Sequence, residues 1–124
     1  MPDRIVVKGE WGTVEYAIKL NGKMPAKDFI ESLRRDETSK LLNPLGKMAE
    51  KGNIWNPQQF RIIKGMREKI YEFKSGQVRL LCFRKGNSWI LTNGFRKGEP
   101  ARKEFQKAIK IMEEHLEVVE GKER

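Results

Sequence analysis

Residues 70–97, IYEFKSGQVRLLCFRKGNSWILTNGFRK, decide the fold of this chain. Apolar and β-branched residues fill three short runs, and small or glycine-containing turns separate them. Glycine supplies the positive φ that tight hairpin turns require. The stretch therefore predicts an antiparallel meander with strands over residues 70–74, 77–84 and 88–95.

The middle run of this meander carries an arginine among apolar residues. Alternation along a strand places Arg79 on the same face as Leu81 and Phe83, and places Leu80 and Cys82 on the other. Both faces are largely apolar. We therefore expect each face to be covered by another element, or one to be left for a protein partner.

The clearest helix follows the meander. After Pro100, residues 101–118 carry apolar side chains at steps of three and four residues, which predicts a helix with one buried face. The members of this face are Phe105, Ala108, Ile109, Met112, Leu116 and Val119.

The N-terminal half predicts one strand and two helices. The expected elements are a strand over 13–20, a helix over 26–33, a helix over 37–51 broken near Asn43-Pro44, and a connector over 53–59. The whole chain, 1–124, is then one α+β domain with a frayed tail over 120–124. Its expected architecture is a curved antiparallel sheet with two N-terminal helices and one C-terminal helix packed on it.

Composition excludes several classes of protein. No apolar run approaches the roughly 18–20 residues of a membrane span, and the first ten residues lack the apolar core of a signal peptide. We therefore expect a cytoplasmic protein without a membrane partner.

With one Cys and one His, the sequence predicts no metal site and no cofactor. Cys82 is expected to be a buried thiol, and His115 a surface or core-edge residue. Trp89 is expected in the core. Trp11 and Trp55 lie in connectors, where we expect them to pack on a helix, with base stacking as the alternative.

Positive charge is concentrated in one segment. The chain has 26 Lys+Arg and 17 Asp+Glu, a net charge of +9. Residues 60–103 hold 12 of the basic residues and 3 acidic ones, so the rest of the chain is neutral. Such concentration favours a local site for a polyanion, nucleic acid first.

Topology predicts where part of this charge gathers. Lys74 ends the first strand of the meander, Arg79 begins the second, and Arg96-Lys97 follow the third, so all four are expected at one rim. A salt bridge from Arg79 to Glu72 on the neighbouring strand is the alternative. RNA supplies its own nucleophile, the 2′-hydroxyl, and cations around the phosphate stabilise the charge that develops during attack. A basic rim is therefore compatible with RNA cleavage as well as with RNA binding.

The segment 70–116 resembles the C-terminal half of RelE/HigB-like toxins of type II toxin–antitoxin modules, closest to the phage-type HigB-like branch. The matching motifs are Tyr71-Glu72-Phe73-Lys74, Val78-Arg79-Leu80-Leu81-Cys82-Phe83, Gly94-Phe95-Arg96-Lys97, and Pro100 followed by Glu104 and Ala108. Many relatives have His immediately before the Gly-Phe pair, where this chain has Asn93. The order of elements matches over roughly 13–118, and residue matches are dense in 70–108.

This resemblance implies a RelE-like fold and a ribosome-dependent mRNA endoribonuclease that inhibits translation. It implies catalytic roles for Lys74, Arg79, Arg96 and Lys97. Arg61, Lys64, Arg67 and Arg102 are expected to bind RNA. The implied partners are the ribosome, mRNA and a cognate antitoxin of helix-turn-helix type, and an open apolar sheet face is a natural antitoxin groove. The general acid and base have no assigned residue. Two alternatives stay open: a non-catalytic, ParE-like gyrase inhibitor, and an RNA- or ribosome-binding module without nuclease activity.

Overall fold

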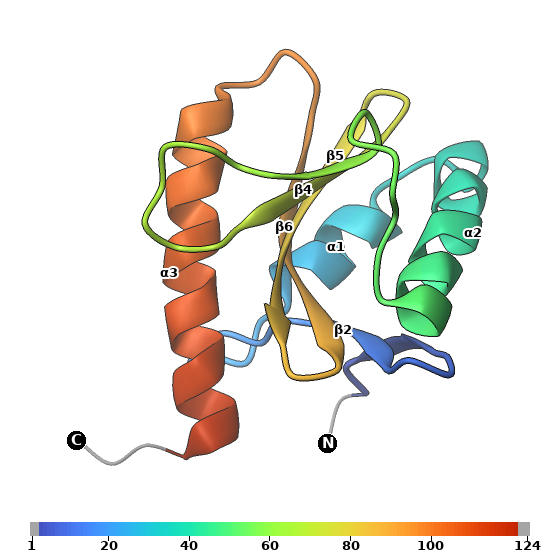
Figure 1. Ribbon diagram of the computed structural model, residues 1–124. Helices are drawn as coiled ribbons and strands as arrows, with labels where there is room; N and C mark the ends of the chain where they lie inside the picture. The colour runs from blue at the N-terminus through green and yellow to red at the C-terminus, as the bar shows by residue number, and fades with distance from the viewer. Residues whose placement is uncertain (1–2, 122–124) are drawn as a thin grey trace.

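The computed structural model describes residues 3–121 and shows an α+β fold, as expected (Figure 1). Its elements in chain order are β1 (Ile5–Lys8), β2 (Thr13–Tyr16), α1 (Pro25–Glu31), α2 (Arg35–Lys51), β3 (Phe60–Ile62), β4 (Tyr71–Ser75), β5 (Val78–Lys85), β6 (Ser88–Arg96) and α3 (Ala101–Glu120). The three meander strands and the last helix lie within two residues of their predicted bounds. The expected tail begins inside α3, at residue 120, and residues 122–124 of it lie outside the described range.

All six strands form one sheet, in the order β1-β2-β6-β5-β4-β3. Neighbouring strands run antiparallel except β2 and β6, which are parallel. The expectation of a purely antiparallel sheet is therefore wrong at this pair. Parallel neighbours need a long crossover connection, and the segment with α1, α2 and the meander supplies it.

The strand predicted over 13–20 ends at Tyr16. After it, the N–H of Ala17 still donates to the carbonyl of Leu91 at 2.8 Å, but the N–H of Ile18 turns to Nδ1 of His115 at 2.9 Å. The chain thus leaves the sheet where a side chain of α3 replaces the neighbouring strand as hydrogen-bond acceptor.

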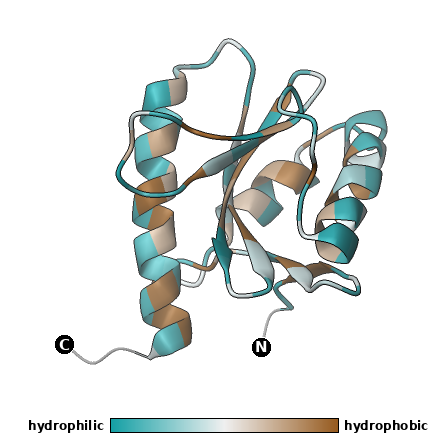
Figure 2. Cartoon of the chain, viewed as in Figure 1, coloured by the Kyte–Doolittle hydropathy of each residue, from teal (hydrophilic) through white to brown (hydrophobic). Residues whose placement is uncertain are grey.

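Helices cover both faces of the sheet, with α1 and α2 on one side and α3 on the other (Figure 1). Leu41, Leu45 and Met48 of α2 pack with Leu80 and Cys82 on the first face. On the opposite face, α3 packs against a second cluster that includes Leu81, Phe83 and Phe95. The alternation predicted for β5 is confirmed, and both of its faces are covered. In Figure 2, hydrophilic and hydrophobic residues alternate along α3, as expected for a helix that buries one side.

α2 continues through Pro44, so the expected break near Asn43-Pro44 is wrong. Proline removes one backbone donor from a helix. Four apolar residues of α2 are buried against the sheet, and burial of this kind contributes more to helix stability than intrinsic propensity does. Gly52 ends the helix in the left-handed conformation, with φ of 79°.

No helix within residues 3–121 combines the length and the apolar character that crossing a bilayer would require.

Candidate functional site

The β4–β5 hairpin brings Lys74 and Arg79 directly opposite each other. Gly76 makes the turn with φ of 59°. Nη1 of Arg79 donates to the carbonyl oxygens of Gly76 at 2.7 Å and Val78 at 3.0 Å, which fixes the guanidinium at the end of the hairpin.

The alternative salt bridge between Arg79 and Glu72 does not form. The buried carboxylate of Glu72 instead accepts from Nε and Nη2 of Arg61 on β3, at 3.2 and 3.0 Å. Arg61 is the residue directly opposite Glu72 in the β3–β4 ladder. Strand β3 is only three residues long, and no pattern in the sequence indicated that it would supply this partner.

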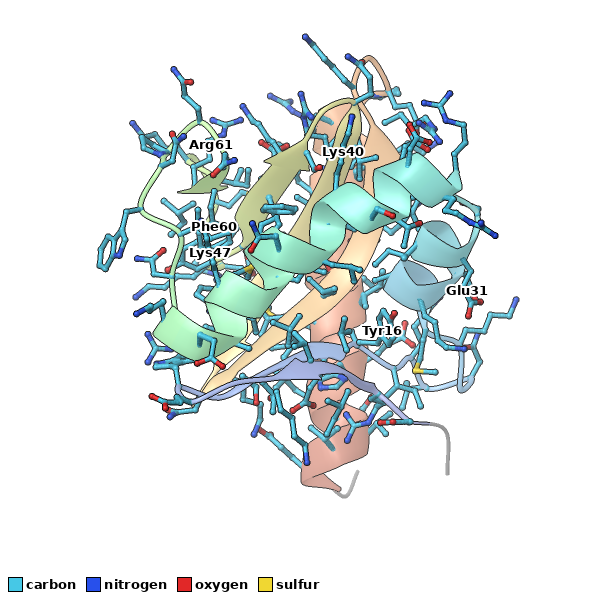
Figure 3. All side chains as sticks on the ribbon, turned by 90° about the vertical axis from the view of Figure 1, so that its right-hand side faces the viewer. Tyr16, Glu31, Lys40, Lys47, Phe60 and Arg61 are labelled. Carbon is cyan, nitrogen blue, oxygen red and sulfur yellow. The ribbon has the colours of Figure 1, made fainter. Side chains whose placement is uncertain are left out.

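A hollow of about 710 Å³ lies between this hairpin end, α2 and the connector before β3. We call it the hairpin hollow. Its basic residues are Lys40, Lys74 and Arg79, and Figure 3 shows Lys40 on the α2 side of the hairpin. Amide side chains surround these cations: Asn43, Asn56, Gln58 and Gln59. The lining contains no carboxylate.

The cations of the hairpin hollow have no carboxylate partner of their own. None of the ion pairs formed within residues 3–121 involves Lys40, Lys74 or Arg79. Cations beside neutral amide donors, in a hollow whose lining has no carboxylate, attract an anion. The hollow thus has the donors and the charge to bind a phosphate group.

Arg96 lies at the same end of the sheet, directly opposite Val78 in the β5–β6 ladder. Nη1 and Nη2 of Arg96 donate to the carboxylate of Glu37 on α2, at 2.7 and 3.0 Å. These bonds, with one from the backbone N–H of Arg34, lower the pKa of Glu37 to about 2. The pair joins α2 to the sheet, and the carboxylate of Glu37 neutralises the charge of Arg96.

Lys97 is exposed next to the hairpin. Its N–H donates to the carbonyl oxygen of Gln77 at 2.8 Å. The four residues expected at one rim are therefore all at one end of the sheet, and two of them, Lys74 and Arg79, line the hairpin hollow.

Three of the residues expected to bind RNA line a second hollow, of about 620 Å³. Lys64 and Arg67 come from the loop between β3 and β4, and Arg102 from the first turn of α3. The loop lies against this end of α3 in Figure 1. Glu68 forms an ion pair with Arg67 at 3.6 Å and reduces the local charge. Arg61, the fourth residue, is paired with Glu72 instead.

Asn93, at the position where the toxins that the sequence resembles often have histidine, has a structural role in the fold. It is 3% exposed. Its Nδ2 donates to the carbonyl oxygen and to Oε1 of Glu104 at 3.2 and 3.1 Å, and its Oδ1 accepts from Thr92 at 2.8 Å. The side chain thus joins β6 to α3 and does not line the hairpin hollow.

Cys82 and His115 are both core residues. Cys82 is buried as expected, and burial raises the pKa of its thiol. His115 is 1% exposed, so its expected place at the surface or core edge is wrong. Its Nδ1 accepts from the N–H of Ile18, and burial lowers the pKa of the imidazole to about 4. Neither side chain lines the hairpin hollow.

Two of the three tryptophans pack, and the third does not. Trp89 is buried, and Trp11 stacks on it with ring centroids 6.4 Å apart. Trp55 is 82% exposed, so the expectation that it packs is wrong. It sits in the connector before β3, where no element of the described chain covers it.

The sequence did not indicate Lys40 or the four amide residues as part of a site. They come from α2 and from the connector, and they reach the hairpin only through tertiary packing. In sequence they belong to the part of the chain without excess charge. Residues 3–121 also contain no cluster of three or more His, Cys, Asp or Glu side chains arranged to hold a metal ion.

No protein-family model matches this chain, and no curated protein is similar to it at a significant level.

Proposed function

We propose that this chain is an RNA-binding toxin of the RelE/HigB-like kind, with a RelE-like fold, and that it binds mRNA phosphates in the hairpin hollow. The observation that carries the proposal is the hollow itself, where Lys40, Lys74 and Arg79 meet without a carboxylate. The phosphates of an RNA backbone can serve as the anionic partner of these three cations, and the amide side chains can donate hydrogen bonds to the phosphate oxygens. The motif match around Lys74 and Arg79 supports the toxin assignment.

In this proposal the hollow promotes ribosome-dependent cleavage by stabilising charge. The RNA 2′-hydroxyl attacks the adjacent phosphorus, a P–O bond forms, and the bond to the 5′-oxygen of the next nucleotide breaks. Arg79 and Lys74 stabilise the extra negative charge on the phosphoryl oxygens. Arginine keeps its proton in proteins, so proton transfers fall to Lys40, Lys74 or water. The implied partners are the ribosome and a cognate antitoxin that blocks the hollow, in the cytoplasm.

A second candidate is RNA or ribosome binding without cleavage. It is favoured by the composition of the hollow, whose titratable side chains are lysine and arginine only. His115 is buried and held by Ile18, and Asn93 is held by Glu104. Nothing in the fold or the hollow favours the other alternative, a gyrase inhibitor.

The test is expression of the chain in bacterial cells with primer extension on translated mRNAs. Cleavage within coding regions is expected, and Lys74→Gln or Arg79→Gln should abolish it. Lys110→Gln is the matched control, since this exposed lysine lies in α3, outside both hollows. Intact mRNA with retained RNA binding would select the second candidate. Blocked DNA supercoiling with intact mRNA would select the gyrase inhibitor, and the absence of RNA binding would refute the proposal.

A further inference from the structure

We propose that the connector between α2 and β3 carries a nucleobase-stacking site at Trp55. An RNA whose phosphate lies in the hairpin hollow would stack a nearby base on this indole. The inference rests on the proposed function and adds base contact to it. Its first support is exposure, because Trp55 leaves 82% of its surface in solvent. A large aromatic side chain this open loses apolar burial that a core position would provide.

A hollow of about 300 Å³ lies beside this indole, and we call it the aromatic hollow. Phe60 and Tyr71 form part of its wall and stack on each other, with centroids 5.4 Å apart and planes 9° apart. Arg61 lies at its rim, and Figure 3 shows Phe60 and Arg61 together at this edge of the sheet. The site therefore places the exposed indole of Trp55 beside other aromatic side chains, and base stacking on aromatic side chains is how many proteins bind single-stranded nucleic acid. Arg61 is already paired with Glu72, so the stacking surface and not a free cation carries the inference.

The connector forms a shared wall between the two hollows. Trp55 and Pro57 line the aromatic hollow, whereas Asn56 and Gln58 line the hairpin hollow. This alternation places an exposed indole next to Asn56 and three residues before Gln58, two of the amides that surround the cations. Each nucleotide of RNA carries a charged phosphate and a flat base. One segment of RNA can therefore place a phosphate in the hairpin hollow and a base against the aromatic hollow.

A hydrogen-bonded turn directly follows Trp55. The N–H groups of Gln59 and Phe60 both donate to the carbonyl oxygen of Asn56, at 2.9 and 3.0 Å. The N–H of Lys74 on β4 donates to the carbonyl oxygen of Gln59 at 2.7 Å, which fixes the turn to the sheet. The backbone directly after Trp55 is thus fixed to the sheet, which lowers the ordering cost of binding at this indole.

The experiment uses the full chain, a labelled single-stranded RNA decamer and inorganic polyphosphate. Trp55→Leu should weaken RNA binding by roughly 5- to 150-fold, the range measured when one base–aromatic stack is removed. Polyphosphate has no bases, so its affinity should not change. Trp55→Phe should restore most of the RNA affinity. Leu42→Ala is the matched control, since Leu42 is also an exposed apolar residue, 64% exposed, on α2.

A second measurement is independent of small changes in stability. The emission of Trp55 is the difference between the spectra of the parent chain and Trp55→Phe. RNA should quench this component and polyphosphate should not. Unchanged RNA affinity in Trp55→Leu, or equal losses for RNA and polyphosphate, would overturn the stacking site. Such a result combined with a loss of binding in Arg79→Gln would leave the proposed function standing. If the parent chain binds no RNA, both proposals are wrong.

Discussion

The hairpin hollow makes a quantitative prediction about the salt dependence of RNA binding. Each phosphate contact on a single strand adds about 0.7 to the slope of log affinity against log salt. Replacing one hollow cation by glutamine should therefore flatten the slope by about 0.7. Replacing Lys40, Lys74 and Arg79 together should flatten it by about 2. Between about 50 and 200 mM salt, the three cations would account for roughly a 20-fold fall in affinity.

Arg79→Gln and Arg84→Gln form a matched pair for this measurement. Both arginines are on β5, but Arg84 lies toward the other end of the strand, with its guanidinium 5.1 Å from the ring centroid of Trp11. Fluorescence anisotropy of a labelled RNA decamer over this salt range gives each slope. Arg79→Gln should lower the slope and Arg84→Gln should leave it unchanged. Equal slopes in the two variants would refute the assignment of phosphate binding to the hairpin hollow.

Three further predictions concern stability, each measured by urea denaturation. The pKa of His115 falls from 6.5 to about 4 in the fold, so the unfolded state binds more protons between these pH values. The free energy of unfolding should therefore drop by about 3 kcal/mol on acidification across that window, and His115→Gln should remove the drop. The lowered pKa of Glu37 stabilises the fold above pH 4.5, and this contribution should be lost as pH falls toward 2; Glu37→Gln should show no such loss, and an equal loss would contradict the role of the Arg96 pair. A Cβ at position 94 would collide with the ring of Phe29, so Gly94→Ala should cost about 1–3 kcal/mol and the added change Phe29→Leu should recover part of it; a neutral Gly94→Ala would show that α1 does not press on β6.

The different surroundings of Gly94 and its neighbours show why the roles of motif residues could not be assigned from the sequence. Gly94-Phe95-Arg96-Lys97 is one signature in the sequence, but its members have different surroundings. Gly94 accommodates Phe29 of α1, and Phe95 is buried under α3. Arg96 pairs with Glu37, which is 59 residues away in sequence. No local pattern could have assigned that pair, because it depends on how α2 packs against the end of β6.

Elements with a strong local signal were predictable, and those defined by long-range pairing were not. The periodic apolar face of α3 and the glycine turns of the meander determine their own structure locally. Strands β1 and β3 have four and three residues and expose much of their surface, so they lack a distinctive alternating pattern. The parallel pairing of β2 with β6 brings together residues 13–16 and 88–91, a relation that no short window contains.

The same reasoning applies to charge. The segment 60–103 carries the whole net charge, yet the ability to bind an anion depends on which cations keep a carboxylate partner after folding. Arg61 and Arg96 belong to that segment and are paired with Glu72 and Glu37. Lys40 comes from the neutral remainder and has no such pair within the described chain.

Folding therefore neutralises part of the basic segment through ion pairs and adds a cation from outside it, Lys40, to the hairpin hollow. The connector before β3 borders the hairpin hollow, and the loop after β3 borders the hollow that contains Lys64 and Arg102. Both segments meet at β3, the edge of the sheet. An RNA that used both hollows would have to pass this edge, where Trp55 is exposed. The position of the unpaired cations, more than their number, is what makes this edge the surface on which RNA binding should be tested.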